Sequence, residues 1–265
     1  MRSLEGLGVL VTRPQPQSSP LCHRLLLEGA RALCFPTLEI EPVGERRALA
    51  AQLGSLAAFD LVIFVSANAV RFGSPLLEQR RDVALAAVGA ATARALNQAG
   101  YRVAVQPEDG SDSESLLRHP RLKSAAGKRF LLVKGEGGRA LLEEELKRRG
   151  AHLTVIEVYR RVRAQPTALD LAALAAEFEA EAVQAITVTS VEVGEALLAL
   201  ATPALRAALE RVAWVVPGTR VAAALRERGV GAPLLLAASA EDQALVEALK
   251  RWRAGESGAK SNESK

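Results

Sequence analysis

The chain has 265 residues, of which 49% are hydrophobic and 24% are charged, and its formal net charge is +4. This length is sufficient for two ordinary cores, and no apolar run reaches the roughly 20 residues needed to cross a bilayer. The N-terminal sequence also lacks a hydrophobic stretch long enough for a secretion signal, so we expect a cytoplasmic protein without a membrane partner.

The first predicted elements form a β-α-β unit. Residues 8–12 are a short apolar run without alternation, which is typical of a buried strand in a parallel sheet. The following helix is predicted to begin with Ser19 as N-cap and Pro20 at its first position, and to end at Gly29. A strand at 32–35 then completes the unit.

The middle of the chain continues the alternation of strands and helices. Residues 36–44 alternate apolar and polar between two prolines, which favours an exposed, extended connector over a core strand. A helix at 45–57 follows. Further strands are predicted at 60–65, 84–88, 102–105, 129–133 and 152–157, and further helices at 68–79, 90–99 and 138–149. Residues 158–166 are again extended and polar, so we expect the return connector there.

The last part of the chain repeats this alternation. Helices are predicted at 167–180, 191–200, 219–228 and 240–253, and strands at 183–189, 211–216 and 232–236. The tail from Ala254 has almost no apolar content, and we expect it to be disordered.

Two sequence patterns occur twice along the chain, in a different order. Segments 61–70 and 86–105 are echoed by 184–198 and 214–230, and segment 8–30 is echoed by 129–151. We therefore expect an α/β protein with two similar flavodoxin- or Rossmann-like lobes, each with a parallel sheet, joined by a two-stranded extended linker. The expected boundaries are 1–36 with 163–253 for lobe 1, 37–162 for lobe 2 and 254–265 for the tail. Ligands of such sheets bind beyond the carboxyl ends of the strands, which predicts an active site in the cleft between the lobes.

Five loops follow apolar strands and open helices. Each supplies hydroxyls, glycines or free backbone N–H groups at the positive end of a helix dipole, which binds carboxylates or phosphates without cationic side chains. The candidate binding residues in these loops are Thr12, Arg13, Ser66, Asn68, Gly89, Thr92, Thr189, Ser190, Pro217, Gly218 and Thr219. For a single loop, helix capping by the polar side chain is the simpler interpretation. The recurrence in both lobes favours a site for an anionic ligand.

One glycine-rich loop has two interpretations. Gly135, Gly137 and Ala140 match the G-x-G-x-x-A variant of the dinucleotide fingerprint, and Glu157 ends the next strand where a ribose-binding acid would lie. Nucleotide binding is therefore an alternative, although this motif normally opens its fold and here comes last in its lobe. The preferred interpretation is an anion site at a helix N-terminus. Its candidate residues are Lys134, Gly135 and Arg139.

Few other side chains are candidates for chemistry. Tyr159 lies on the return connector and can donate a proton while staying neutral, so it is a candidate general acid; packing at the junction of the lobes is the alternative. Cys22 and Cys34 have no partner at metal-ligand spacing and are expected to be buried spectator thiols. The three histidines are scattered, so no metal is expected. Aromatic residues make up only 4% of the chain, which argues against nucleic acid.

Seven segments in this order resemble the uroporphyrinogen-III synthase family, over residues 8 to about 250. They are VLVTRP, FVSANAV, AVGAATARAL, GSDSESLL, LLVKGEGGRALLEEELKRRGA, IEVYRR and VVPGTRVAAAL. The resemblance implies a lyase that needs no cofactor. Such an enzyme closes linear hydroxymethylbilane to uroporphyrinogen III, with loss of water and inversion of the last pyrrole ring, in haem biosynthesis. No oligomer interface is apparent in the sequence, so we expect a monomer, with a transient contact with the preceding pathway enzyme as its expected protein partner.

The resemblance also implies roles for individual residues. Tyr159 would assist departure of the hydroxyl, and Ser66, Thr92 and Ser190 match positions at the cleft. Closure would pass through an azafulvene cation and a spiro intermediate. The chain departs from the family pattern in two loops, at Val191, Glu192 and Val221. A two-lobed protein that binds an anionic metabolite without transforming it is the alternative from another class.

Overall fold

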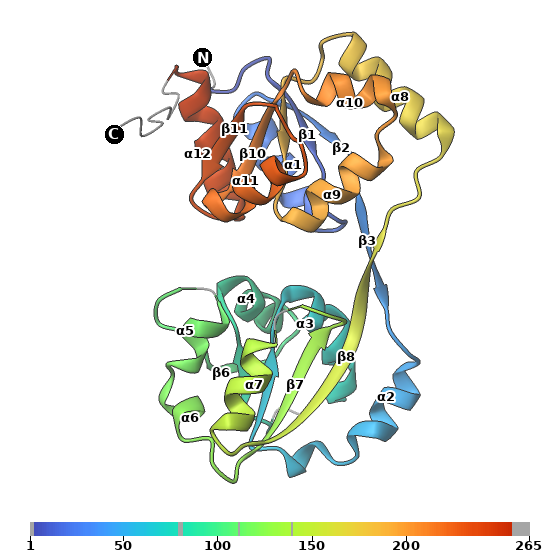
Figure 1. Cartoon of the computed structure of the whole chain (residues 1–265). Coiled ribbons are helices and arrows are strands. Elements are labelled where there is room, and N and C mark those ends of the chain that lie inside the picture. Colours follow the sequence, from blue (N-terminus) through green and yellow to red (C-terminus); the bar gives the residue numbers. More distant parts are fainter. Residues whose placement is uncertain (1–2, 79–81, 111, 139, 256–265) are drawn as a thin grey trace. The chain divides into compact units, whose positions relative to one another are not determined.

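The chain divides into two compact units, shown in Figure 1. This computed structural model describes residues 3–78, 82–110, 112–138 and 140–255. Unit 1 is assigned to Met1–Glu39 with Val162–Lys265, and unit 2 to Ile40–Arg161. Within the described residues, no helix is both long enough and apolar enough to cross a membrane.

Unit 1 is built on a parallel five-stranded sheet in the order β11-β10-β9-β1-β2. Its strands are β1 (Gly8–Val11), β2 (Arg31–Cys34), β9 (Ala185–Thr187), β10 (Ala213–Pro217) and β11 (Leu234–Ala237). One face packs against α1 (Ser18–Leu27) and α12 (Asp242–Arg253). The helices on the other face are α8 (Ala168–Glu179), α9 (Val191–Leu200), α10 (Pro203–Leu209) and α11 (Gly218–Glu227).

Unit 2 contains a six-stranded sheet in the order β3-β8-β7-β4-β5-β6. Its strands are β3 (Leu38–Pro42), β4 (Leu61–Phe64), β5 (Leu85–Ala87), β6 (Val103–Val105), β7 (Arg129–Gly135) and β8 (His152–Arg163). One face is covered by α2 (Arg46–Leu53), η1 (Leu56–Ala58), α3 (Ala67–Gly73), η2 (Ser74–Leu77) and α4 (Ala90–Gln98). The other is covered by α5 (Ser113–Leu117), α6 (Pro120–Lys123) and α7 (Leu141–Arg148).

The two strand orders correspond to one another, as the echoes in the sequence predict. Reading β6-β5-β4-β7-β8 in unit 2 against β11-β10-β9-β1-β2 in unit 1 aligns β4 with β9 and β7 with β1. The chain passes from one unit to the other twice, once within β3 and once within β8. Each unit therefore has the same parallel core, although unit 1 is assembled from both ends of the chain.

Some predicted boundaries are wrong. Helix α1 begins at Ser18 rather than after Ser19, because the N–H groups of Ser18 and Ser19 already donate to the carbonyls of Pro14 and Pro16. The connector predicted at 158–166 is largely the continuation of β8, which runs unbroken from His152 to Arg163. Helices α5, α6 and α10 were not predicted.

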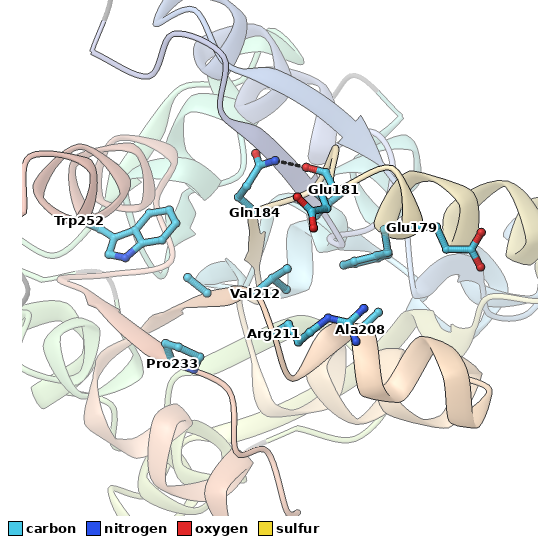
Figure 2. Close-up of a pocket in the computed structure, with 11 residues that line it drawn as sticks. Glu179, Glu181, Gln184, Ala208, Arg211, Val212, Pro233 and Trp252 are labelled. Carbon is cyan, nitrogen blue, oxygen red and sulfur yellow. Dashed lines mark hydrogen bonds between the residues drawn. The ribbon is translucent and has the colours of Figure 1, made fainter.

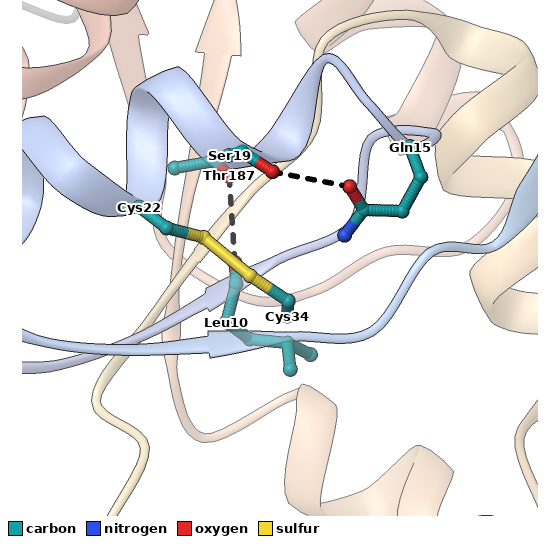
Figure 3. The surroundings of a disulfide bond; sticks show 6 residues. All are labelled: Leu10, Gln15, Ser19, Cys22, Cys34 and Thr187. Atoms are coloured by element: carbon teal, nitrogen blue, oxygen red, sulfur yellow. Dashed lines mark hydrogen bonds between the residues drawn. A yellow bond between two sulfur atoms is a disulfide. The ribbon is translucent and has the colours of Figure 1, made fainter.

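The two cysteines do not match the expected buried thiols. Figure 3 shows Cys22 of α1 joined to Cys34 of β2 by a disulfide, with Cα atoms 7.3 Å apart. Cys22 is half-buried and Cys34 is exposed. The helix packs back onto the strand that follows it, so that residues 12 positions apart meet across the helix-strand contact. The pairing depends on this contact in the fold, which the spacing of the two cysteines in the sequence does not reveal.

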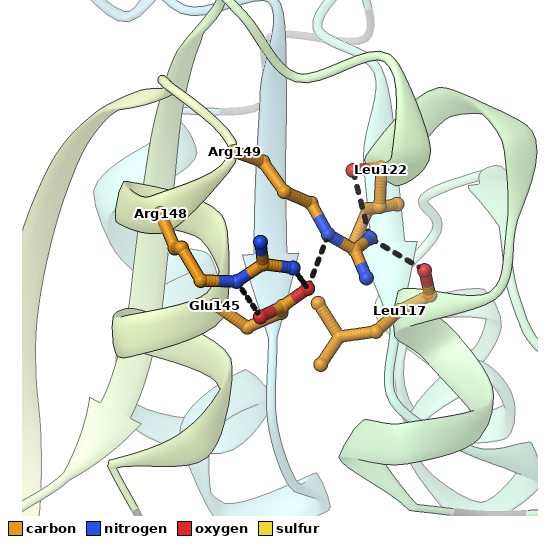
Figure 4. Close-up of polar contacts among 5 residues, drawn as sticks. All are labelled: Leu117, Leu122, Glu145, Arg148 and Arg149. Carbon is orange, nitrogen blue, oxygen red and sulfur yellow. Dashed lines mark hydrogen bonds and ion pairs between the residues drawn. The ribbon is translucent and has the colours of Figure 1, made fainter.

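A cluster of charges ties α7 to α5 and α6 in unit 2 (Figure 4). Glu145 accepts hydrogen bonds from Arg148 and Arg149, at 2.6 to 2.7 Å. Arg149 also donates to the carbonyls of Leu117 and Leu122, at 2.7 and 3.1 Å. The hydrogen bonds from Arg148, and then the one from Arg149, lower the pKa of Glu145 from its ordinary value of 4.5 to about 2.

This cluster predicts a defined loss of stability in acid. A carboxylate with a lowered pKa in the folded state stabilises the fold above its unfolded pKa, and this stabilisation is lost as the pH falls from about 4.5 through about 2. Glu145→Gln cannot lose this charge, so its free energy of unfolding should fall less over that range than the parent's. Urea unfolding at several pH values across this range measures how steeply the free energy of unfolding falls in each protein. Glu144→Gln, an exposed neighbour on the same helix, should behave like the parent.

Candidate functional site

In unit 2, several candidate residues lie at the carboxyl-end edge of the sheet. Ser66 follows β4, Gly89 follows β5 and Gly135 ends β7. Tyr159 of β8 is paired in register with Gly135. Because these neighbouring strands are parallel, their carboxyl ends meet at one edge, and the structure brings Ser66, Gly135 and Tyr159 together there.

Tyr159 is held by more contacts than the other candidates at this edge. It is only 2% exposed, and its hydroxyl lies 3.1 Å from Ser66 Oγ. Its ring is stacked with Phe72, with centroids 6.1 Å apart. The guanidinium of Arg161 lies over the same ring, 5.8 Å from its centroid, at cation-π distance. The phenol is thus held on several sides within the core of unit 2.

A pocket of about 280 Å³ opens beside this tyrosine. Its lining includes Tyr159, Gly135, Lys134, Glu143 and Arg161. Lys134 Nζ lies 2.6 Å from Glu143 Oε1, so its ammonium is already paired with a carboxylate from the first turn of α7. This differs from the expectation that Lys134 is held ready for an anion. The third residue of that expectation, Arg139, lies outside the described residues.

The same loop does not favour the nucleotide alternative. Helix α7 carries two acids in its first turn, Glu143 and Glu144, where the pyrophosphate of a dinucleotide would bind. The space above Gly135 is filled by the ring of Tyr159. Glu157 is paired in register with Lys134 inside the sheet rather than lying beyond a strand end. These three features argue against a nucleotide at the fingerprint.

The other candidates of unit 2 lie at the starts of α3 and α4. Ser66 is the N-cap of α3, and its Oγ accepts from the N–H of Ala69 at 3.0 Å. Asn68 and Thr92 are both buried within the first turns of these helices. Gly89 is the N-cap of α4 and offers no side chain to cap it, which leaves the first N–H groups of that helix for another acceptor.

In unit 1, Thr12 and Arg13 follow β1 but face inward. Thr12 is completely buried, and its hydroxyl donates to the carbonyl of Thr187 at 2.6 Å. Arg13 is 8% exposed; it donates to Asp242 Oδ1 at 2.5 Å and to the carbonyl of Ala240 at 2.9 Å. Both side chains therefore tie the loop after β1 to its surroundings, which differs from the expected role in substrate binding.

Two further loops of unit 1 lie at the same edge. Ser190 is the N-cap of α9, and its Oγ accepts from the N–H of Val193 at 3.2 Å, whereas Thr189 before it is half-buried. Pro217 ends β10, and Gly218, with φ +75°, begins α11, which has no side-chain cap. Thr219 is exposed. Ser66 and Ser190 thus cap their helices, whereas the N-cap residues of α4 and α11 make no side-chain cap.

The departures from the family pattern are accommodated differently. Val221 is 3% exposed and packs in the core of unit 1, where a threonine would bring a hydroxyl into apolar surroundings. Glu192 lies in the first turn of α9, where a carboxylate interacts favourably with the helix dipole.

A larger pocket, of about 540 Å³, was not predicted (Figure 2). It lies at the amino ends of β9, β10 and β11, opposite the edge that carries the candidate residues. Phe178 and Trp252 contribute apolar surface, and Arg211, Glu179 and Glu181 contribute charge. None of the site residues predicted from the sequence lines this pocket.

Sequence reasoning also missed the partners of the candidates. Asp242 binds Arg13 across 229 positions, which no local pattern reveals. Arg161 was detectable, because it lies two residues after Tyr159 in a strand and so shares its side. Among the described residues, no group of three or more His, Cys, Asp or Glu side chains is placed to hold a metal ion.

Comparison with known proteins identifies one family. The sequence profile described as uroporphyrinogen-III synthase HemD matches residues 20–247. The uroporphyrinogen-III synthases of Escherichia coli and Salmonella typhimurium are each 34% identical over 250 residues, which cover 92% of this chain and all of each relative. A mutant uroporphyrinogen III synthase from Thermus thermophilus is similar in structure, with 25% identity and a TM-score of 0.57, over 94% of this chain and 99% of that one. The enzyme from Helicobacter pylori shares the fold, with a TM-score of 0.61 at 16% identity, over 91% of this chain and 97% of that one.

Proposed function

The chain belongs to the uroporphyrinogen-III synthase family, and from this premise we propose that it cyclises hydroxymethylbilane to uroporphyrinogen III as a lyase that removes water without a cofactor. The observation that carries the proposal is the buried phenol of Tyr159, which lies 3.1 Å from Ser66 Oγ beside a pocket. A neutral phenol can donate a proton to a departing hydroxyl, which makes it suited to act as the general acid of this step.

Ser66 prepares Tyr159 for this role. Its Oγ accepts from the N–H of Ala69, and at 3.1 Å either hydroxyl of the Ser66–Tyr159 pair has the geometry to donate; the proposed mechanism uses the arrangement in which Ser66 donates to the oxygen of Tyr159. The proton of Tyr159 is left for the substrate. When that proton moves to the leaving hydroxyl, water departs, and the phenolate oxygen accepts from Ser66 while the cation of Arg161 lies over the ring.

The remaining steps need little acid or base chemistry. Loss of water leaves an azafulvene cation, which the substituted carbon of the terminal pyrrole attacks to form a spiro intermediate. Fragmentation and reclosure then invert that ring. The main task of the protein is to hold a flexible chain in the conformation that leads to inversion, and such positioning supplies a large part of a rate enhancement.

We assign the carboxylates of the substrate to two of the helices that begin without a side-chain cap. These are α4, after Gly89, and α11, which begins at Gly218. Each offers N–H groups at the positive end of its dipole, so it binds a carboxylate without a cationic partner. Of the other candidates, Ser190, Thr189 and Thr219 contribute hydroxyls at the edge of unit 1, and Asn68 and Thr92 support the helices of unit 2.

Incubation with hydroxymethylbilane tests the proposal. The bilane closes by itself to the type I isomer, so we expect the type III isomer only when the protein is present, as read by separating the porphyrins after oxidation. The reaction should proceed equally in a protein sample dialysed against a metal chelator. A product that remains type I would contradict the proposed activity, and binding of the bilane without conversion would favour a binding protein.

Three further assignments continue the expectations from the sequence. We propose that the protein acts in the cytoplasm, as a monomer, and makes transient contact with the enzyme that supplies hydroxymethylbilane. Analytical ultracentrifugation, with and without that enzyme, measures the last two.

A further inference from the structure

Gly135 stands where a side chain would strike the phenol of Tyr159. A Cβ built on Gly135 would lie 2.5 Å from Cζ of Tyr159, and 2.7 and 2.9 Å from its two Cε atoms. These are the ring atoms at and beside the hydroxyl. Gly135 is not among the glycines with positive φ, so its backbone would suit any residue. The reason for a glycine at this position is therefore space, and the space is taken by the reactive end of Tyr159.

A β-bulge brings Tyr159 over this glycine. Lys134 pairs with Glu157, but the next residue, Gly135, pairs with Tyr159, so that Val158 is an extra residue in β8. Strict alternation would send Val158 and Tyr159 to opposite faces of the sheet. Both are instead buried in the same core, on the face covered by α3 and α4.

The bulge leaves its carbonyls paired. The carbonyl of Val158 accepts from the N–H of Val43 at 3.1 Å, and that of Tyr159 accepts from the N–H of Glu136 at 2.8 Å. Bulges next to active sites commonly re-aim a side chain. Here the bulge turns the phenol toward Ser66, which follows β4 on the other side of β7.

We propose that Gly135 and the bulge at Val158 form a positioning device, which directs the hydroxyl of Tyr159 to Ser66 and to the pocket. The catalytic use of the hydroxyl rests on the proposed function, whereas the positioning of the ring does not. Gly135 is a positioning residue, because it acts through Tyr159. Its replacement should displace the phenol, since the ring is packed against Phe72 and has little room to yield.

Gly135→Ala is the direct test. We expect about a 100-fold loss in the rate of type III formation, the size of effect that a misplacement of about 1 Å produces. In the Tyr159→Phe background, where the hydroxyl is already missing, Gly135→Ala should lower the rate per folded molecule by less than about 3-fold. An equal loss in both backgrounds would overturn the proposal, because the glycine would then act independently of the hydroxyl.

The position of the ring is read separately from activity. The chain has two tyrosines, so selective 13C labelling of tyrosine rings gives two sets of signals, which Tyr101→Phe assigns. In Gly135→Ala the signals of Tyr159 should shift and those of Tyr101 should stay. Unmoved Tyr159 signals would overturn the proposal even if activity is lost. If the parent forms no type III product, the proposed function fails, but this spectrum still tests the positioning.

Two further variants guard against simple instability. Gly194→Ala makes a similar clash in the core of unit 1, 2.5 Å from Cδ2 of Leu225, so it should leave the Tyr159 signals in place. If Gly135→Ala does not fold, glycine and alanine at position 135 are compared in the Tyr159→Ala background, where no ring remains for the added methyl to clash with. There the added methyl should cause no further loss of thermal stability, and a further loss would contradict the proposal.

Discussion

Tyr159→Phe is expected to slow the formation of uroporphyrinogen III by about 100-fold, since a positioned general acid typically contributes a factor of about 10² to 10⁴. The ring, its stacking on Phe72 and its cover by Arg161 all remain in this variant. Only the hydroxyl and its 3.1 Å contact with Ser66 are removed. The free energy of unfolding should therefore fall by only about 1 kcal/mol, the usual net value of one hydrogen bond.

The comparison that isolates this effect is Tyr101→Phe. Tyr101 is the other tyrosine of unit 2, and its hydroxyl donates to the carbonyl of Ser74 at 3.4 Å. Its replacement should leave the rate unchanged. Rates are measured from the type III isomer alone, because spontaneous closure supplies a background of type I. A Tyr159→Phe protein with the parent's rate would remove the acid role and leave positioning as the source of catalysis.

The equivalence of the two sheets could be predicted because the chain contains the same arrangement twice, whereas the order of the strands within each sheet was not predicted. Echoed segments must form equivalent strands, and the equivalence of β4 with β9 and of β7 with β1 follows from the sequence alone. The start of α10, which was not predicted, also has a local signal in the sequence. Thr202 accepts from the N–H of Leu205, and Pro203 follows it at the first position of α10, a capping pattern that is readable without a structure.

The bulge at Val158 could not be predicted in the same way. Residues 152–163 alternate poorly, and a period of two assigns Tyr159 to the wrong face of the sheet. Which residue is extra depends on the partner strand, because the shift is defined by Lys134 and Gly135 in β7. The glycine and the tyrosine were each noticed in the sequence, but their contact depends on pairing between two strands.

The burial of Arg13 shows why loop residues are harder to assign than strands. A cation at the carboxyl end of a strand is equally suited to an anionic ligand and to a carboxylate of the protein. The choice depends on Asp242, which lies in the first turn of α12 at the far end of the chain. The role of Arg13 therefore has to be tested through its partner.

Asp242→Ala is expected to destabilise unit 1 by about 3 kcal/mol, the lower end of the usual cost of removing one partner of a buried ion pair. The buried guanidinium of Arg13 loses its carboxylate partner and keeps its hydrogen bond to the carbonyl of Ala240 at 2.9 Å. The side chains of Arg13 and Asp242 are 9% and 22% exposed, so solvent replaces the lost carboxylate poorly. Urea unfolding, followed by circular dichroism, measures the change. Glu241→Ala is the matched control, since Glu241 is exposed and makes no side-chain cap to α12.

A second substitution separates a structural role of Arg13 from substrate binding. Removing both charges, in Arg13→Met with Asp242→Ala, should restore part of the stability lost in Asp242→Ala alone, because no unpaired charge is left buried. If Arg13 instead binds a carboxylate of the substrate, Asp242→Ala would leave stability nearly unchanged, and Arg13→Met would raise the KM for hydroxymethylbilane. The burial and the two hydrogen bonds of Arg13 favour the first outcome, in which this loop is held by the ion pair so that the neighbouring strand ends keep their places.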